Sequence, residues 1–343
     1  MSHEAYMKRA LDLASLGLGS VSPNPMVGCV IVCNEKIIGE GWHKKYGGPH
    51  AEVEAVNSIQ EKSLIPEATC YVTLEPCSHY GKTPPCADLL IKMGFRKVVI
   101  ANTDPNPQVN GKGISKLKAA GIEVITGILE KEACKLNKRF FASIEKNRPY
   151  IILKWAVSRD GYVAQTDGTP VQMSGKLAQM HAHKWRTEED AILVGASTVI
   201  NDNPLLTSRH WKGRDPQAFV WDPEGRTGTN SRLYQKKAAA TVFGGPAVEN
   251  RIALGQDDKN VEFLIAELQN RKIGSLIVEG GPRLHKLFLD KNCFDEIRVI
   301  ESKGLILNEG IPSAQIPVEI CRSATLDLQT DYIHFFSKDF QPF

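Results

Sequence analysis

Residues 69–86 read TCYVTLEPCSHYGKTPPC and join a β-rich run to a helical one. The β-branched and aromatic residues at its start predict a strand over Thr69–Leu74. The Pro-Pro pair near its end predicts a helix from about Pro85, because proline is favoured at or just before a helix start, where its missing N–H is not required. A strand that leads into a helix in this way is the repeating unit of an α/β fold.

The residues on either side of this stretch repeat the alternation of strand and helix. After an opening amphipathic helix, we expect strands at 27–33, 36–42, 97–101 and 122–126, and helices from about His50, over 111–120 and from about Glu130. This alternation predicts an α/β domain built in layers around a largely parallel sheet. The polar run SIEKNRP at 143–149 ends the domain, because the step from Arg148 to Pro149 favours an extended chain.

A second α/β series follows the polar run. We expect strands at 150–157, 191–194, 217–221, 240–243 and 275–278, with helices over 174–186 and after Gly280-Gly281. The chain is therefore expected to divide into domains at 1–146 and 147–343, in keeping with about 150 residues per domain.

The composition is that of a globular protein. Of the 343 residues, 42% are apolar and 24% are charged, and the formal net charge is +3. So small a surplus gives no broad basic surface for nucleic acid or an anionic membrane, and no apolar run reaches the ~18 residues that span a bilayer. The N-terminus has the pattern of an amphipathic helix and not that of a signal peptide. We therefore expect a soluble, cytoplasmic protein.

The eight cysteines are not expected to form disulfides, because a chain of this length has enough apolar residues to fold without them. Cys29 and Cys33 share one face of a predicted strand and are expected in the core. Cys77 and Cys86 have a different setting, since each directly follows a proline, as His50 does.

His50, Cys77 and Cys86 form a candidate zinc site. All three are predicted at helix N-termini, where the partial positive charge of the helix end lowers the pKa of a cysteine and favours the thiolate. Three protein ligands leave the fourth tetrahedral position of zinc to water, as in catalytic sites, and zinc lowers the pKa of that water to roughly 7. Glu52 is then placed to move a proton from the water to a leaving amine, the arrangement known from zinc deaminases.

The eight residues between Cys77 and Cys86 separate this chain from ordinary zinc deaminases, which have two residues there. In this spacing the sequence resembles the bifunctional deaminase/reductase family of riboflavin biosynthesis. The resemblance is carried by PNPMVGCV at 23–30, GPHAE at 48–52, the stretch 71–86 and DPNPQVNGKG at 104–113. It implies a cytidine-deaminase-like three-layer α/β fold for the first domain.

The resemblance also implies the chemistry of the first domain. Zinc would be held by the three residues named above, with Glu52 as the proton shuttle. The substrate would be 2,5-diamino-6-ribosylamino-4(3H)-pyrimidinone 5′-phosphate, which loses its 2-amino group as ammonia. Amide groups suit a polar heterocycle, and cationic side chains suit a phosphate. The candidate substrate contacts are Asn24, His79, Lys82 and Asn106.

Three fragments of the second domain resemble the reductase half of the same family, which has the dihydrofolate reductase fold. They are KWAVSRDG at 154–161, DAILVGASTV at 190–199 with NDNPLLTSR at 201–209, and LIVEGGP at 276–282. The implied reaction is hydride transfer to C1′ of the opened ribose. By position, an NADPH site would be lined by Ala156, Thr198, Asp202 and Gly281, and the ribosyl phosphate substrate would be contacted by Lys154, Arg186, Leu206, Arg209 and Glu279.

The second domain departs from its relatives at three positions. Gln172 stands where most have tryptophan, Asn203 replaces the second aspartate of Asp-Asp-Pro, and Pro223 replaces the serine of Asp-Ser. A deaminase with a degenerate reductase domain is therefore one alternative. The others are a structural zinc site completed by Cys70 or His79, a nucleoside or nucleic-acid deaminase, and a zinc-stabilised interaction module. We expect a homo-oligomer that acts on a small phosphoribosyl pyrimidine, with neither nucleic acid nor membrane as a partner.

Overall fold

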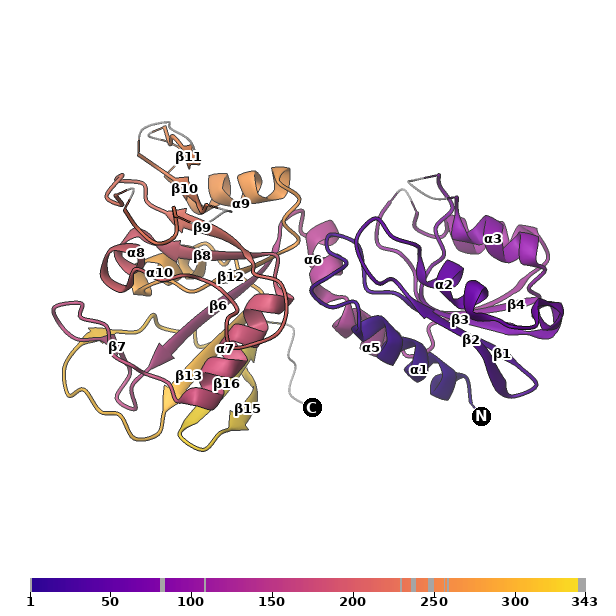
Figure 1. Cartoon of the computed structure of the whole chain (residues 1–343), viewed down its shortest axis with the longest axis horizontal. Coiled ribbons are helices and arrows are strands. Elements are labelled where there is room, and N and C mark those ends of the chain that lie inside the picture. Colours follow the sequence, from indigo (N-terminus) through magenta and orange to yellow (C-terminus); the bar gives the residue numbers. More distant parts are fainter. Residues whose placement is uncertain are drawn as a thin grey trace. The chain divides into compact units, whose positions relative to one another are not determined.

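The computed structural model describes residues 2–80, 84–107, 109–228, 230–235, 239–245, 250–255, 257 and 259–338. The chain divides into two compact units, Met1–Asn147 and Arg148–Phe343 (Figure 1). This division falls one residue beyond the boundary expected from the polar run at 143–149. Among the described residues, every helix is too short or too polar to cross a lipid bilayer.

The first unit is built on a five-stranded sheet of order β2-β1-β3-β4-β5. Its strands are β1 Gly28–Cys33, β2 Lys36–Trp42, β3 Thr69–Leu74, β4 Lys97–Asn102 and β5 Glu123–Thr126. The expectation of a largely parallel sheet is wrong here: β3, β4 and β5 are parallel, but β1 runs antiparallel to both of its neighbours. The antiparallel pairing of β1 with β2 has a local cause, because Asn34 and Glu35 have positive φ angles of 48° and 59° and close a two-residue hairpin between the two strands.

Helices cover both faces of this sheet. They are α1 His3–Ser15, α2 Ala51–Ser58, α3 Cys86–Met93, α4 Lys112–Ala119, α5 Glu130–Leu136 and α6 Lys138–Glu145, with a 3₁₀ turn, η1, at Lys62–Glu67. Strand β1 is buried on both sides: Cys29 and Cys33 belong to a core cluster with residues of α2 and α3, and Val30 and Val32 belong to a second cluster with residues of α1 and α5. The three-layer α/β architecture and the core positions of these two cysteines are thus confirmed.

The second unit is built on a nine-stranded sheet of order β11-β10-β9-β8-β12-β6-β13-β16-β15. Its strands are β6 Tyr150–Val157, β8 Ala191–Gly195, β9 Gln217–Trp221, β10 Thr241–Phe243, β11 Arg251–Ile252, β12 Ser275–Val278, β13 Glu296–Ser302, β15 Arg322–Asp327 and β16 Asp331–Ser337, and a separate pair joins β7 Tyr162–Ala164 to β14 Ile311–Pro312. The sheet is parallel from β11 to β13 and antiparallel from β13 to β15. The last three strands of the large sheet were not expected from the sequence.

Helices again lie on both faces of the second sheet. They are α7 Lys176–Glu188, α8 Ala196–Asp202, α9 Val261–Asn270 and α10 Pro282–Asp290. Leucine and phenylalanine side chains of α9 and α10 pack into the core on one face, and Trp185 of α7 contacts Arg298 and Phe335 on the other. Because β12 lies between β8 and β6 and is parallel to both, the carboxyl ends of these three strands meet at one edge of the sheet. Open α/β sheets bind ligands at such an edge.

Candidate functional site

His50, Cys77 and Cys86 come from three separate segments. His50 is the N-cap of α2, and Cys86 is the first residue of α3. The prediction that Cys77 also begins a helix is wrong, because it lies in the irregular chain between β3 and α3. It still faces a helix start, since the backbone N–H of Cys86 donates a hydrogen bond to the Cys77 sulfur at 3.3 Å. The stabilisation of the thiolate therefore comes through space, from the first turn of α3.

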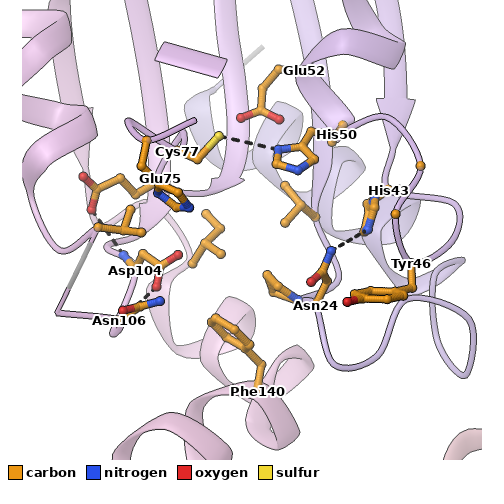
Figure 2. Close-up of a pocket in the computed structure, with 18 residues that line it drawn as sticks. Asn24, His43, Tyr46, His50, Glu52, Glu75, Cys77, Asp104, Asn106 and Phe140 are labelled. Carbon is orange, nitrogen blue, oxygen red and sulfur yellow. Dashed lines mark hydrogen bonds between the residues drawn. The ribbon is translucent and has the colours of Figure 1, made fainter. Parts of the chain in front are cut away.

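The three side chains fit a zinc ion. The His50 Nδ1 atom lies 3.6 Å from the Cys77 sulfur and 3.3 Å from the Cys86 sulfur (Figure 2). Ligands held at the usual Zn–S and Zn–N distances with tetrahedral angles are about 3.6 Å apart. Within the part of the chain that the structure describes, this is the one cluster of three or more potential ligands, and all its ligand atoms lie within 4.8 Å of one another.

Neither residue considered as a fourth ligand joins this cluster. The Cys70 sulfur lies in the core, 3.5 Å from the sulfur of Cys29. His79 lines the neighbouring pocket and is not among the clustered ligand atoms. The described residues therefore offer three ligands, which is the number typical of catalytic zinc.

The two ligand sulfurs share a proton when no metal is bound. A hydrogen bond from the Cys86 thiol lowers the pKa of Cys77 to about 4, with a further contribution from His50. The same hydrogen bond, together with burial, raises the pKa of Cys86. Zinc binding requires both thiolates, so it displaces this proton.

Glu52 lies beside the metal ligands. It is the second residue of α2 and is only 3% exposed. Figure 2 shows its carboxylate next to the Cys77 sulfur and the His50 ring. Burial raises its pKa, and the neighbouring Cys77 adds to this effect. A raised pKa makes the carboxylate a stronger base, which favours a role in accepting a proton and passing it on.

A pocket with a volume of about 340 Å³ opens in front of Glu52 and the metal ligands, a size suited to a small molecule. The predicted substrate contacts Asn24, His79 and Asn106 all line it, whereas Lys82 lies outside the described residues. Its other lining residues include several side chains that the sequence analysis did not select. These are His43, Tyr46, Glu75, Asp104 and Phe140 (Figure 2).

His43 fixes the orientation of the Asn24 amide. The His43 Nδ1 atom lies 2.9 Å from the carbonyl oxygen of Pro49, so this nitrogen carries the proton. Burial lowers the pKa of His43, which keeps the ring neutral. Its Nε2 atom therefore accepts a hydrogen bond from the Asn24 Nδ2 group at 3.2 Å. The oxygen of the Asn24 amide is left on the pocket side, where it can accept from an N–H group of a ligand (Figure 2).

Helix α6 closes the pocket from a distant part of the chain. Asn137, just before it, accepts a hydrogen bond from the Met26 N–H and donates one to the Met26 carbonyl, both at 2.8 Å. These bonds hold α6 against the segment that carries Asn24. Phe140 projects from α6 into the pocket and supplies an apolar wall (Figure 2).

In the second unit, three of the predicted substrate contacts form one buried ion network. The Glu279 carboxylate accepts two hydrogen bonds from Arg186, at 2.8 and 2.9 Å, and one from Lys154 at 3.1 Å. Burial alone would raise the pKa of Glu279, but the two cations hold it well below its usual range. Arg186 also donates to the carbonyl oxygen of Thr207 at 2.9 Å. The network therefore links the middle of β6, the last turn of α7 and the residue after β12 to the 203–209 loop.

The remaining predicted contacts are spread around the same edge of the sheet. Leu206 is buried with a positive φ of 50°, and Arg209 is exposed. The proposed NADPH contacts lie near the carboxyl end of β6, on α8 and just before α10. They are Ala156, Thr198, Asp202 and Gly281.

Two of the three side chains that depart from the family pattern, Gln172 and Asn203, form hydrogen bonds with backbone groups. Gln172 is exposed and donates to the carbonyl oxygen of Ser174 at 2.8 Å. Asn203 ends α8 with a positive φ of 39°, and its side-chain oxygen accepts from the Arg232 N–H at 2.9 Å. Asparagine tolerates this left-handed conformation well.

Together, the fold and the site define a zinc deaminase unit of the cytidine deaminase class, followed by a second α/β unit. Residues 1–102 match the family described as cytidine and deoxycytidylate deaminase zinc-binding region, and residues 149–302 match the RibD C-terminal domain. The riboflavin biosynthesis protein RibD of Aquifex aeolicus is 40% identical, over 97% of this chain and 98% of its own length. The chain therefore belongs to the RibD family.

Solved structures agree along the whole chain. A diaminohydroxyphosphoribosylaminopyrimidine deaminase/5-amino-6-(5-phosphoribosylamino)uracil reductase from Thermotoga maritima has a TM-score of 0.89 and 37% identity, and 98% of each chain is covered. The RibD of Acinetobacter baumannii has a TM-score of 0.90 and 34% identity, with the same coverage. The expected pair of folds, cytidine-deaminase-like and dihydrofolate-reductase-like, is thus confirmed.

Proposed function

We propose that this chain catalyses two consecutive steps of riboflavin biosynthesis. The first is hydrolytic deamination of 2,5-diamino-6-ribosylamino-4(3H)-pyrimidinone 5′-phosphate, and the second is NADPH-dependent reduction of its ribosyl group to a ribityl chain. The observation that carries the proposal is the convergence of His50, Cys77 and Cys86 beside the buried Glu52 carboxylate. The relative from Thermotoga maritima, whose name states both activities, supports the pairing of the two steps.

In the deamination step, Glu52 moves the protons. His50, Cys77 and Cys86 would hold a zinc ion, which would supply the Lewis acidity that lowers the pKa of a water molecule to about 7. The Glu52 carboxylate accepts a proton from the attacking water and delivers it to the 2-amino group of the pyrimidine. A C–O bond forms, the C–N bond breaks and ammonia leaves, so that the net reaction consumes one water molecule.

The pocket side chains orient the substrate for this reaction. The Asn24 oxygen, fixed by His43, accepts a hydrogen bond from an N–H group of the pyrimidine. Asn106 contacts the heterocycle from the opposite side of the pocket, and His79 and Lys82 bind the ribose phosphate. Phe140 packs against the ring and excludes water.

In the reduction step, the ion network of the second unit orients the ribosyl phosphate. When bound, NADPH would supply the hydride for C1′, and a proton from solvent would complete the reduction. Arg186 and Arg209 bind anionic oxygens of the substrate, with Leu206 beside them, and Glu279 holds Arg186 and Lys154 in place. The four predicted cofactor contacts, Ala156, Thr198, Asp202 and Gly281, would hold the nicotinamide nucleotide at the carboxyl edge of the sheet.

Both halves of the chain match their families, so we do not retain the alternative of a deaminase with a degenerate second domain. We also propose a cytoplasmic homo-oligomer that binds no nucleic acid. The net charge of +3 supports the lack of nucleic-acid binding. Within the part of the chain that the structure describes, β15 forms one edge of the large sheet, which supports association between copies because such an edge can accept a further strand.

The test is to measure the two reactions separately on the purified protein. With the diaminopyrimidine substrate alone, we expect release of one ammonia per substrate and no further change. Added NADPH should then be oxidised in proportion to the deaminated product. A zinc-loaded protein that releases no ammonia would contradict the first step, and a protein that releases ammonia without oxidising NADPH would contradict the second.

A further inference from the structure

Glu75 is a buried carboxylate to which the deamination chemistry assigns no role. It directly follows β3, precedes Cys77 by two residues and is only 4% exposed. One carboxylate oxygen accepts from the backbone N–H groups of Gly113 at 2.8 Å and Ile114 at 3.1 Å. The other accepts from those of Gly111 at 2.9 Å and Asp104 at 3.3 Å (Figure 2).

The four partners of the Glu75 carboxylate are all backbone N–H donors, and its two oxygens divide them equally. A carboxylate offers acceptors at both oxygens, which matches these four donors. A glutamine of the same shape would turn its NH₂ group toward two N–H groups, whichever way its amide is oriented. The four donors therefore require a carboxylate at this position, with the length of a glutamate side chain.

The four donors belong to residues 104–107 and 109–114, which border the pocket and are called the 104–114 segment below. Asp104 and Asn106 of this segment line the pocket, and the Asp104 carboxylate accepts from the Asn106 N–H at 2.8 Å. The segment also packs tightly on the loop that carries Cys77, since a Cβ atom on Gly113 would lie 2.0 Å from the carbonyl oxygen of Pro76. The residue that leads into the Cys77 loop thus holds the segment that presents Asn106.

We propose that Glu75 is a positioning residue of the deaminase. It fixes the 104–114 segment, so that Asn106 contacts the substrate at the correct distance from the metal ligands. This rests on the proposed function of the first unit. Both oxygens of Glu75 bind backbone N–H groups, and Glu75 is not among the clustered ligand residues, so its loss should disturb substrate binding and leave the metal in place.

The test is steady-state kinetics of ammonia release together with zinc content for Glu75→Gln. Misplacement of a positioning group by about 1 Å can cost about 10²-fold in rate. We expect kcat/KM to fall about 10- to 100-fold, mainly through a higher KM, with one zinc per chain retained. Glu75→Asp keeps the carboxylate but shortens the side chain by one methylene group. It should therefore raise KM less than Glu75→Gln does.

Asp222→Asn is the matched control. Asp222 is a fully buried carboxylate of the second unit that accepts from the backbone N–H groups of Arg226 at 2.9 Å and Thr227 at 2.8 Å. The same chemical change there should leave KM and kcat of deamination unchanged.

Three results would overturn the proposal for Glu75. They are an unchanged KM in both Glu75 variants, a loss of zinc with unchanged KM in the variants that fold, and failure of both variants to fold, which would make Glu75 a stability residue. Absence of ammonia release from the unsubstituted protein would instead refute the proposed function, so the two failures are distinguishable.

Discussion

Glu52 is the residue on which deamination depends most directly. We predict that Glu52→Gln lowers the rate of ammonia release by about 10²- to 10⁴-fold, because an amide cannot shuttle the proton. Zinc content should stay at one per chain, since Glu52 is not among the clustered ligand atoms. Metal analysis and an ammonia assay on the same sample check both points. Loss of zinc in this variant would mean that Glu52 is a ligand, and unchanged ammonia release would remove it from the mechanism.

His285 gives the second unit a pH-dependent stability. The residue is 1% exposed, its Nε2 atom lies 3.1 Å from the Val278 carbonyl oxygen, and its ring packs on Trp155. Burial lowers its pKa from 6.5 to about 4. Between these values the unfolded chain binds more protons than the folded one, so stability is complete above about pH 6.5 and is lost as the pH falls toward 4.

We therefore predict that His285 removes about 2 kcal/mol of stability from the second unit between pH 7 and pH 5. Urea unfolding followed by tryptophan fluorescence at the two pH values measures this loss. The His285→Gln variant cannot gain a proton there and should have the flatter pH dependence. Equal slopes for the variant and the unsubstituted protein would show that His285 does not titrate in this range.

The metal ligands were predictable because each is part of a short motif whose chemistry is explicit in the sequence. His50, Cys77 and Cys86 each follow a proline between a predicted strand and the next helix, and they do converge. His43 and Phe140 belong to no such motif. Their positions in the pocket depend on how distant segments pack, as with Asn137, which holds α6 against residues more than a hundred positions earlier. Single-sequence patterns do not contain that information.

At the scale of elements, α6 is the part of the first unit that shapes substrate affinity without touching the metal. We predict that Phe140→Ala raises KM for deamination about tenfold, in line with the one to three kcal/mol that a buried aromatic contact contributes. The kcat value and zinc content should change little. Phe141→Ala is the matched control, because Phe141 is next to it on the same helix and does not line the pocket. Equal effects of the two substitutions would indicate a general loss of stability.

The strands that carry the site were predictable, and the edges of the sheets were not. Strands β3, β6 and β12 have the bounds expected from their apolar runs, because both of their faces are buried. Strand β15 is largely exposed and lacks the alternation of apolar and polar residues that marks a half-buried strand. Whether β1 runs parallel or antiparallel to β3 depends on how the strands pair in the folded chain. A run of apolar residues predicts a strand but not its direction.

At the scale of the whole molecule, each unit has its own core. Two clusters of buried residues lie on the two faces of the first sheet, and a separate large cluster lies within the second unit. We predict that a protein ending at Asn147 folds, retains one zinc and releases ammonia at a rate within about tenfold of that of the full chain. The complementary piece from Arg148 should oxidise NADPH with the deaminated substrate only. Loss of zinc from the shorter protein would show that the deaminase site requires the second unit.

The zinc coordination shell of the purified full-length protein is the most direct measurement of the central claim. X-ray absorption at the zinc edge should find two sulfur neighbours at about 2.3 Å, one imidazole nitrogen at about 2.0 Å and one oxygen that does not come from the protein. Addition of a substrate analogue should alter that oxygen and leave the sulfur and imidazole neighbours unchanged. A third sulfur or a second imidazole would complete a closed structural site and contradict the assignment of deamination to this metal.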